Sequence, residues 1–437
     1  MLDIYPRFCA AVTPYCQPSS RLVVGLSGGV DSRVLLALAA RYGREYQVPC
    51  VAVHVHHGLS LNADDWASQC AHWCEESGIA LVVERITLAR QGGESLEQIA
   101  RDGRYQALHR HIRPGDLLLT GQHADDQVET FLLALKRGSG PKGLACMAPV
   151  SSFGEGMLIR PLLEVSREQI EALALSESLE WVEDESNQDT RFERNFIRHQ
   201  LMPQLTERWP VFRRSVQRSA RLCAEQEALL DELLADKYQM VSAKDDSLNI
   251  SALDECSTVM RNRLLRMWFA VHQQRMPGHA HLALIWSEVA CAQQDANPRL
   301  KIDQVEVRRF AGHLYLVAHC ADVSGWQRPI LPEQPLTLPQ GLGQLRMIHT
   351  EGQGYLNLSH CDPNQFWVTF DPTGLSAHPA GRSHSRKLKK LFQEYGVPSW
   401  LRRRTPILMY QEQVVCVAGV FVDRAFKGQD CELIWDK

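Results

Sequence analysis

The chain has 437 residues, of which 45% are hydrophobic and 22% are charged, and its formal net charge at pH 7 is −4. These values are typical of a globular protein with room for about three domains, and the negative charge confines any nucleic-acid-binding surface to local patches. No apolar run approaches the roughly 18 residues of a membrane helix and the start, MLDIYPRF, is unlike a signal peptide, so we expect a cytoplasmic protein without a membrane partner.

Residues 21–42, RLVVGLSGGVDSRVLLALAARY, begin as an apolar run, break into a Ser/Gly loop and continue as a helix-like pattern. This order predicts a strand, a phosphate-binding loop and a helix. Gly28 and Gly29 have no Cβ, so the backbone can turn sharply and bring its N–H groups against an anion. The helix that begins near Asp31 directs its unsatisfied N–H groups at the same anion. The predicted anion-binding residues are Ser27, Gly28, Gly29, Val30, Asp31 and Ser32.

This loop lacks the Lys of G-x-x-x-x-G-K-[ST] and does not match G-x-G-x-x-G. It resembles the pyrophosphate loop, SGGxDS, of enzymes that split ATP between its α and β phosphates and leave an adenylated substrate. The alternative is a Gly-rich turn that binds nothing. The strand, both serines and Asp31 in register favour ATP.

Strand-like and helix-like stretches alternate through residues 1–140, as in an open parallel sheet. After the first strand we expect strands over residues 48–56, 80–88 and 116–120, and helices over residues 62–78, 94–112 and 125–137. Ligands of doubly wound sheets bind at the carboxyl ends of the strands, near a topological switch point. The loops after Leu26, Val55, Leu88 and Thr120 should therefore face one crevice.

The loop after the second strand carries three histidines. The period of a strand places His54 and His56 on one face and His57 on the other. We therefore favour polar lining of a nucleotide pocket over a metal site.

The helix predicted over residues 94–112 carries Arg101 and Arg104 on one face, three residues apart. Both could be solvated at the surface. Alternatively, one of them contacts the α-phosphate of ATP, where charge must be neutralised before adenylyl transfer.

Residues 120–130 read TGQHADDQVET. A helix that starts at Asp125 can be capped by that residue, and Asp126 and Glu129 then share one face with His123 just ahead of them. Helix-dipole stabilisation explains the carboxylates but not the histidine at the crevice. Paired carboxylates there could bind the ammonium group of an amino acid, or Mg²⁺ beside ATP.

Farther along the chain, a helix capped at Ser166 precedes residues 181–198, which mix acidic residues with Arg191, Arg194 and Arg198. These arginines are spaced by three and four residues on a helix-like face. Such spacing suits phosphate or base contacts.

Beyond residue 203 we expect helices over residues 209–239 and 253–293, the second capped by Ser251, and a hairpin over residues 301–319. Residues 382–404 then carry eight Lys or Arg against one acid. The aromatic residues among these charges favour a nucleic-acid-binding helix over a merely solvated one.

Five segments, in order across about residues 22–203, resemble those of tRNA(Ile)-lysidine synthetases: SGGVDS, HVHHGLSLNADDW, GQHADDQVETFLLALKRGSG, LIRPLL and WVEDESNQDTRFERNFIR. The resemblance implies ATP-dependent activation of the C2 carbonyl of the wobble cytidine in the CAU anticodon of tRNA(Ile). The ε-amine of L-lysine then attacks C2, which yields lysidine, AMP and pyrophosphate. It also implies Mg²⁺ as a cofactor, and a homodimer is possible.

By motif position, the resemblance implies that residues 27–32 bind ATP and that Asp31 assists adenylation with Mg²⁺. One of Arg101 or Arg104 would steady the α-phosphate. The remaining implied roles are lysine binding by His123, Asp126 and Glu129, and contact with the target base by Arg194. The turn reads His-Ala-Asp-Asp where the family pattern has Asn before the second Asp, so the role of Asp125 stays open.

The same resemblance divides the chain into three parts. Residues 1–208 would form the α/β catalytic domain with a doubly wound parallel sheet of the adenine nucleotide α-hydrolase type. Residues 209–325 would form a mainly helical tRNA-binding domain, and residues 326–437 a small α+β domain that recognises tRNA.

The chemistry of the expected reaction sets its own requirements. A ring carbonyl oxygen leaves badly as hydroxide, whereas adenylation converts it to AMP. Lysine, with a side-chain pKa near 10.4, must lose a proton before it attacks, and His123 is the candidate base.

Two alternative functions stay open. A tRNA thiolase would use the same loop, but paired cysteines usually serve its sulfur chemistry, and the 13 cysteines include no C-x-x-C. We interpret them as buried, reduced thiols. The other alternative is a non-catalytic ATP-binding protein that binds RNA.

Overall fold

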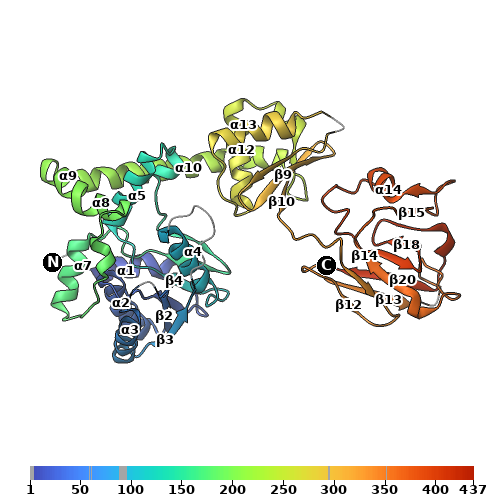
Figure 1. The fold of residues 1–437 in the computed structure, drawn as a ribbon. Coiled ribbons are helices and arrows are strands. Elements are labelled where there is room, and N and C mark those ends of the chain that lie inside the picture. The colour runs from blue at the N-terminus through green and yellow to red at the C-terminus, as the bar shows by residue number, and fades with distance from the viewer. Residues whose placement is uncertain (1–3, 59, 61, 88–95, 294–295, 351) are drawn as a thin grey trace. The chain divides into compact units, whose positions relative to one another are not determined.

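The computed structural model describes the whole chain apart from residues 1–3, 59, 61, 88–95, 294–295 and 351 (Figure 1). It divides into two compact units, Met1–Glu232 and Leu233–Lys437. The three-domain division expected from the sequence stays a prediction. Within the described residues, no helix is both long and apolar enough to cross a membrane.

A six-stranded sheet forms the centre of the first unit, in the order β3-β2-β1-β4-β6-β5. All neighbouring strands are parallel except β5 and β6, a hairpin that the sequence analysis did not predict. Its strands are β1 Leu22–Gly25, β2 Cys50–His56, β3 Ala80–Arg85, β4 Leu117–Leu119, β5 Val150–Phe153 and β6 Gly156–Ile159. The predicted strands are present, and the α/β fold with a parallel sheet is confirmed.

Helices cover both faces of this sheet (Figure 1). Leu22 and Val24 pack into a core shared with the helices α1, α2, α3 and α7, whereas Val23 faces the opposite side and packs with Leu108 of α4. Because successive strand residues point to opposite faces, one apolar run builds both cores. The helices before β5 are α1 Ile4–Val12, α2 Val30–Tyr46, α3 Ala63–Ser77, α4 Leu96–His109, α5 Ala124–Lys136 and α6 Pro141–Leu144.

The chain reverses its direction across the sheet at β1. It runs from β1 to β2 and β3 on one side and then returns to β4 on the other. The carboxyl ends of β1 and β4 therefore flank a topological switch point, which is where ligands bind in such folds. The loops that lead into α2 and α5 begin there.

Short helices follow β6 and lead into a long one. Ser166 caps α7 and accepts a hydrogen bond from the backbone N–H of Gln169, as the sequence predicted. The elements are α7 Arg167–Ser176, α8 Glu193–Phe196, a π-helical turn Ile197–Leu201, α9 Met202–Arg208 and α10 Phe212–Val241. The predicted helix over residues 209–239 is therefore present as α10.

The second unit contains more sheet than we expected. A four-stranded sheet, β7-β10-β9-β8, packs on helices around Trp268 and Phe269. Its elements are β7 Leu248–Asn249, α11 Ile250–Asp254, α12 Thr258–Val271, α13 His279–Leu284, a π-helical turn Ile285–Ala290, β8 Arg299–Ile302, β9 Val305–Phe310 and β10 His313–Ala318. The predicted hairpin is β9 and β10.

The single helix expected over residues 253–293, with Ser251 as its cap, is wrong. Asn249 caps α11 and Ser257 caps α12, each through its side-chain oxygen. Pro277, which has no backbone N–H, and Gly278 then separate α12 from α13. Competing caps and one proline thus divide the helical pattern.

The rest of the second unit is mainly β-structure. Its elements are β11 Gln327–Pro329, β12 Leu336–Thr337, β13 Gln344–His349, β14 Phe366–Thr369, β15 Ser376–Ala377, β16 Arg386–Lys387, α14 Leu388–Glu394, β17 Ile407–Tyr410, β18 Gln413–Val417, β19 Phe421–Val422 and β20 Cys431–Asp436. The basic segment 382–404 is helical only over α14, where Leu388, Leu391 and Phe392 are buried. Lys387, Lys389 and Lys390 stay exposed.

We predict that Gly28→Ala destabilises the protein by about 1–3 kcal/mol, because an L residue would be strained there. Gly28 has a φ of +96°, and a Cβ would lie 2.9 Å from Cγ2 of Val182. Gly29→Ala is the matched control, since its φ is −69° and the nearest atom to its Cβ would be 3.8 Å away. Urea unfolding of both variants is the measurement. Equal stability of the two would contradict the prediction.

Candidate active site

The loop between β1 and α2 is held in a tight turn by the side chain of Ser32. The Ser32 hydroxyl accepts hydrogen bonds from the N–H groups of Ser27 and Gly28, each 3.1 Å long, and donates one to the carbonyl of Gly29. Gly29 precedes Val30, the first residue of α2, so the dipole of a 17-residue helix points at the loop. The structure therefore brings the predicted residues from Ser27 to Ser32 into one turn at the start of a helix, a geometry that suits an anion.

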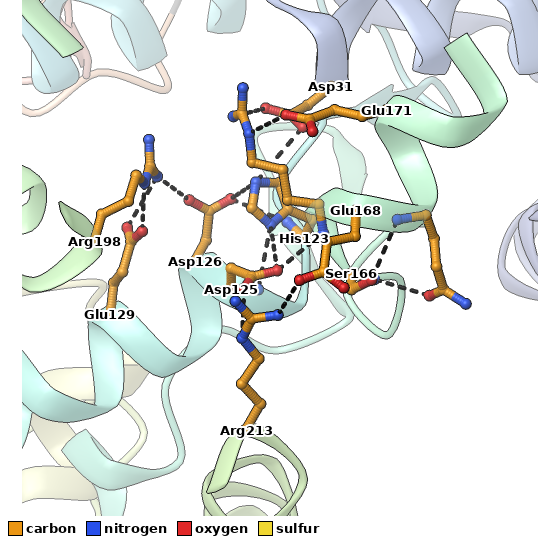
Figure 2. A network of polar contacts seen from close by, with 12 residues as sticks. Asp31, His123, Asp125, Asp126, Glu129, Ser166, Glu168, Glu171, Arg198 and Arg213 are labelled. Carbon is orange, nitrogen blue, oxygen red and sulfur yellow. Dashed lines mark hydrogen bonds and ion pairs between the residues drawn. The ribbon is translucent and has the colours of Figure 1, made fainter. Parts of the chain in front are cut away.

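The turn after β4 packs directly on this loop. A Cβ on Gly121 would lie 3.1–3.2 Å from backbone atoms of Asp31 and Ser32, so the two backbones are nearly in contact. This close approach places His123 beside Asp31 (Figure 2). The first turns of α2 and α5 thus meet at the switch point of the sheet.

His123, and not Asp125, caps α5. Its Nδ1 accepts a hydrogen bond of 3.2 Å from the backbone N–H of Asp125. The backbone N–H of His123 in turn donates to the Asp126 carboxylate at 3.0 Å. The cap prediction for Asp125 is therefore wrong, because the buried imidazole two residues earlier satisfies the free N–H group.

This cap also decides the protonation pattern of His123. Because Nδ1 is an acceptor, a neutral ring carries its proton on Nε2. Nε2 lies 3.5 Å from carboxylate oxygens of both Asp31 and Asp126. In this state Nε2 carries the proton that faces the two carboxylates, and Nδ1 is occupied by the helix cap, which does not favour the prediction of His123 as a base.

One carboxylate oxygen of Asp31, Oδ1, faces Nε2 of His123 at 3.5 Å but accepts no hydrogen bond from the described residues. This oxygen is buried, whereas Oδ2 of Asp31 accepts a hydrogen bond of 3.4 Å from Nη1 of Arg167. Burial raises the pKa of Asp31, and the charges of His123 and Arg167 offset part of that rise. A buried carboxylate oxygen beside an anion-binding loop is a fitting ligand for Mg²⁺.

Glu129 and Asp126 are paired with Arg198 (Figure 2). Nε and Nη2 of Arg198 donate to the two oxygens of Glu129 at 2.7 and 3.1 Å, and Nη2 lies 3.4 Å from Asp126. The Glu129 side chain is only 2% exposed, and burial raises its pKa although Arg198 opposes the rise. Arg194 lies 4.0 Å from Glu129.

Asp125 joins three helices. It accepts a hydrogen bond of 2.9 Å from the backbone N–H of Arg167 at the start of α7, and its other oxygen lies 3.0 Å from Nε of Arg213 in α10. Arg213 also donates to Glu168 at 3.1 Å. Sequence reasoning missed Arg167 and Arg213, because no local pattern links them to α5.

The structure does not gather all the predicted arginines in this network. Arg191 pairs with Asp189 at the surface, at 2.7 Å. Arg101 and Arg104 lie on α4, where Arg101 stacks over Tyr105 with its Cζ 5.4 Å from the ring centroid. The face shared by Arg191, Arg194 and Arg198 is thus divided between solvent and the buried carboxylates.

The two histidines at the end of β2, His54 and His56, have structural contacts. Nδ1 of His54 lies 2.9 Å from the carbonyl of Leu26, and burial lowers the pKa of this histidine. Nε2 of His56 lies 3.3 Å from Asp64. His54 therefore supports the end of β1, next to the loop that binds the anion.

The fold and the loop define a PP-loop ATP-binding domain. A family model described as "PP-loop domain" matches residues 4–205. Two further models, described as "TilS substrate binding domain" and "TilS substrate C-terminal domain", match residues 248–315 and 367–436.

The chain belongs to the tRNA(Ile)-lysidine synthase family. It is 58% identical over 434 residues to the tRNA(Ile)-lysidine synthase of Vibrio vulnificus, with 99% of each chain covered. It is 50% identical over 421 residues to that of Photobacterium profundum, with 95% of each covered. This membership makes the chain a tRNA-modifying ligase that uses ATP.

Among solved structures, the chain resembles the U34-tRNA thiolase NcsA from Methanococcus maripaludis. The identity is 19% and the TM-score is 0.41, over 51% of this chain and 78% of that chain. A similarity of this size does not transfer the activity of that protein to this one.

We predict that the stability difference between Asp31→Asn and the unaltered protein depends on pH. The ordinary pKa of this carboxyl is 3.8 and burial raises it in the folded state, so the folded protein binds the proton more tightly than the unfolded chain. The stability contributed by Asp31 therefore falls as pH rises from about 4 through the folded pKa, by about 1.4 kcal/mol for each pH unit that separates the folded and unfolded pKa values.

Asn cannot titrate, so the variant should gain stability relative to the unaltered protein between pH 4 and pH 7. Urea unfolding across that range is the measurement. The exposed Asp65→Asn is the control and should show no such trend. A gain that is constant or shrinks with pH would count against the raised pKa.

Proposed function

We propose that this chain ligates L-lysine to C2 of the wobble cytidine in the CAU anticodon of tRNA(Ile). The cytidine is first adenylated by ATP with release of pyrophosphate, and lysine then displaces AMP to form lysidine. The observation that carries this proposal is the direct packing of an ATP-type loop against the start of α5, which carries Asp126 and the buried Glu129. Similarity to lysidine synthases over the whole chain supports it.

Activation of the cytidine is assigned to the loop and to Asp31. Residues 27–32 bind the phosphates that leave as pyrophosphate, because the start of α2 favours negative charge. Asp31 would hold Mg²⁺ through Oδ1, which accepts no hydrogen bond from the described residues, and the ion would neutralise charge on the phosphates. Arg101 or Arg104 steadies the α-phosphate.

Lysine binding is assigned to Asp126 and Glu129, with His123 as the group that orients Asp126. Both carboxylates already face the guanidinium of Arg198. An incoming ammonium group must therefore share them with Arg198 or displace it. Arg194, at the edge of the same group, approaches the target base.

Proton removal from the lysine ε-ammonium is also assigned to these carboxylates. Lysine attacks only as the neutral amine, and its ordinary pKa is near 10.4. A buried carboxylate with a raised pKa, such as Glu129, is a better proton acceptor than an exposed one.

The cytoplasmic location and the homodimer stay predictions.

One assay tests the proposal and separates it from its alternatives. The protein is incubated with ATP, labelled lysine and unmodified tRNA(Ile), and pyrophosphate and label in RNA are measured. We expect both products, each dependent on tRNA. Pyrophosphate without lysine in RNA would favour a thiolase or another PP-loop enzyme, and no pyrophosphate would favour a non-catalytic ATP-binding protein.

We predict that Asp126→Asn separates the two half-reactions. Loss of one charge-assisted hydrogen bond to an ammonium group costs about 1.5–3 kcal/mol, or roughly 10- to 150-fold in lysine use. Adenylation should survive, so AMP–RNA adduct accumulates and high lysine partly rescues the product. Adduct formation and the lysine KM are measured together, with Asp65→Asn as control. Loss of adduct at an unchanged lysine KM would assign Asp126 to ATP and Mg²⁺ instead.

We predict that replacing Lys387, Lys389 and Lys390 by Gln weakens tRNA binding. Each lost phosphate contact should reduce the slope of log Kobs against log salt by about 0.7–0.9. The affinity for ATP, which binds in the other compact unit, serves as the internal control. An unchanged slope would mean that these exposed lysines are only solvated.

A further inference from the structure

A second group of positive charges lies outside the carboxylate network. Arg160 follows directly after β6, and its backbone N–H and its Nη1 donate to the carbonyls of Pro149 and Ala148, at 2.8 and 2.7 Å. Its Nε is buried and has no hydrogen-bond partner among the described residues. The guanidinium is thus fixed by a backbone carbonyl, but one of its buried N–H donors has no acceptor among the described residues.

Tyr105 of α4 brings Arg160 and Arg101 together. Its ring packs edge-on against Phe153 of β5, with centroids 6.0 Å apart, and the guanidinium of Arg101 stacks over it. The Tyr105 hydroxyl is buried and forms no hydrogen bond of ordinary geometry with the described residues. Burial lowers the pKa of Arg160, the neighbouring Tyr105 opposes this, and the nearby charge of Arg101 lowers it further.

The charge balance of this cluster differs from that of the catalytic network. There, Arg167, Arg198 and Arg213 each lie within 3.4 Å of a carboxylate. In the described part of the chain, no carboxylate forms an ion pair with Arg101, Arg104 or Arg160. The buried Nε of Arg160 and the buried hydroxyl of Tyr105 interact with each other but form no hydrogen bond of ordinary geometry, and an anion that accepts from both would satisfy them.

The sheet places this cluster beside the catalytic site. β6 pairs with β4 and β4 pairs with β1, so the carboxyl end that carries Arg160 lies two strands from the ATP loop. Strands are spaced by about 4.8 Å, which puts the cluster about 10 Å from the loop along the same edge. This distance is well suited to a phosphate other than those held by the loop.

We propose that Arg160, with Arg101 and the hydroxyl of Tyr105, binds a backbone phosphate of the RNA next to the target nucleotide, which leaves Arg104 for the α-phosphate of ATP. The inference rests on the proposed function. A base that reacts at its ring must leave its stack, and phosphate contacts then fix the displaced nucleotide. Arginine suits this task, because its planar fork of donors matches a phosphate.

The test uses the full-length protein and an anticodon stem-loop RNA with a CAU anticodon. Arg160→Gln should weaken RNA binding about tenfold and reduce the log–log salt slope by about 0.7, with the Kd for ATP unchanged. Arg110→Gln is the matched control, because it removes the same charge just beyond α4 from a side chain that is 57% exposed. It should leave RNA binding within twofold.

Tyr105→Phe is a second variant that does not depend on Arg160. It keeps the packing on Phe153 and removes a hydroxyl that has no hydrogen-bond partner among the described residues, so folding should be unaffected. RNA binding should weaken about threefold, again without change in the Kd for ATP.

The outcomes separate this inference from the proposed function. Weaker ATP binding with unchanged RNA binding would mean that the bound phosphate belongs to ATP, which overturns the RNA assignment. RNA binding unaltered in both variants would overturn the inference alone. Failure of the unaltered protein to bind the stem-loop would overturn both.

Discussion

The close contact between two backbone turns, one after β1 and one after β4, is the constraint on which the rest of the site depends. A Cβ on Gly121 would lie only 3.1–3.2 Å from backbone atoms of Asp31 and Ser32, so the first turns of α2 and α5 lie against each other at the sheet edge. Two helix N-termini favour negative charge. The carboxylates and the phosphates that we propose to bind here would nevertheless repel each other. Cations must therefore balance the carboxylates if both groups are to lie side by side.

Those cations come from elements that are distant in sequence. Arg167 begins α7, Arg198 lies in the π-helical turn and Arg213 lies in α10, and each reaches a carboxylate of α2 or α5. Burial still raises the pKa values of Asp31 and Glu129. The arginines thus oppose the rise in pKa that burial causes, and a new cation such as Mg²⁺ or an ammonium group would oppose it further.

The two groups of arginines have different roles in the site. Arginines paired with carboxylates hold the helices together, whereas Arg101 and Arg160 have no carboxylate partner in the described residues and suit an incoming anion. An adenylated-RNA reaction needs both kinds, because ATP and RNA bring many negative charges to one place. The structure supplies the cationic surface without disturbing the carboxylates that bind lysine in our proposal.

The sequence by itself determined the parallel sheet, the ATP loop and the family, because these depend on local order: alternating apolar runs, a Ser/Gly turn and five motifs in sequence. It also identified Asp31, His123, Asp126 and Glu129 as one group. It could not decide that His123 caps α5, that Asp125 binds Arg213, or that Arg191 and Arg198 face different surroundings. Helical spacing places residues on a common face, but only tertiary packing decides what that face meets, since an ion pair forms across more than 60 residues of chain as readily as across four.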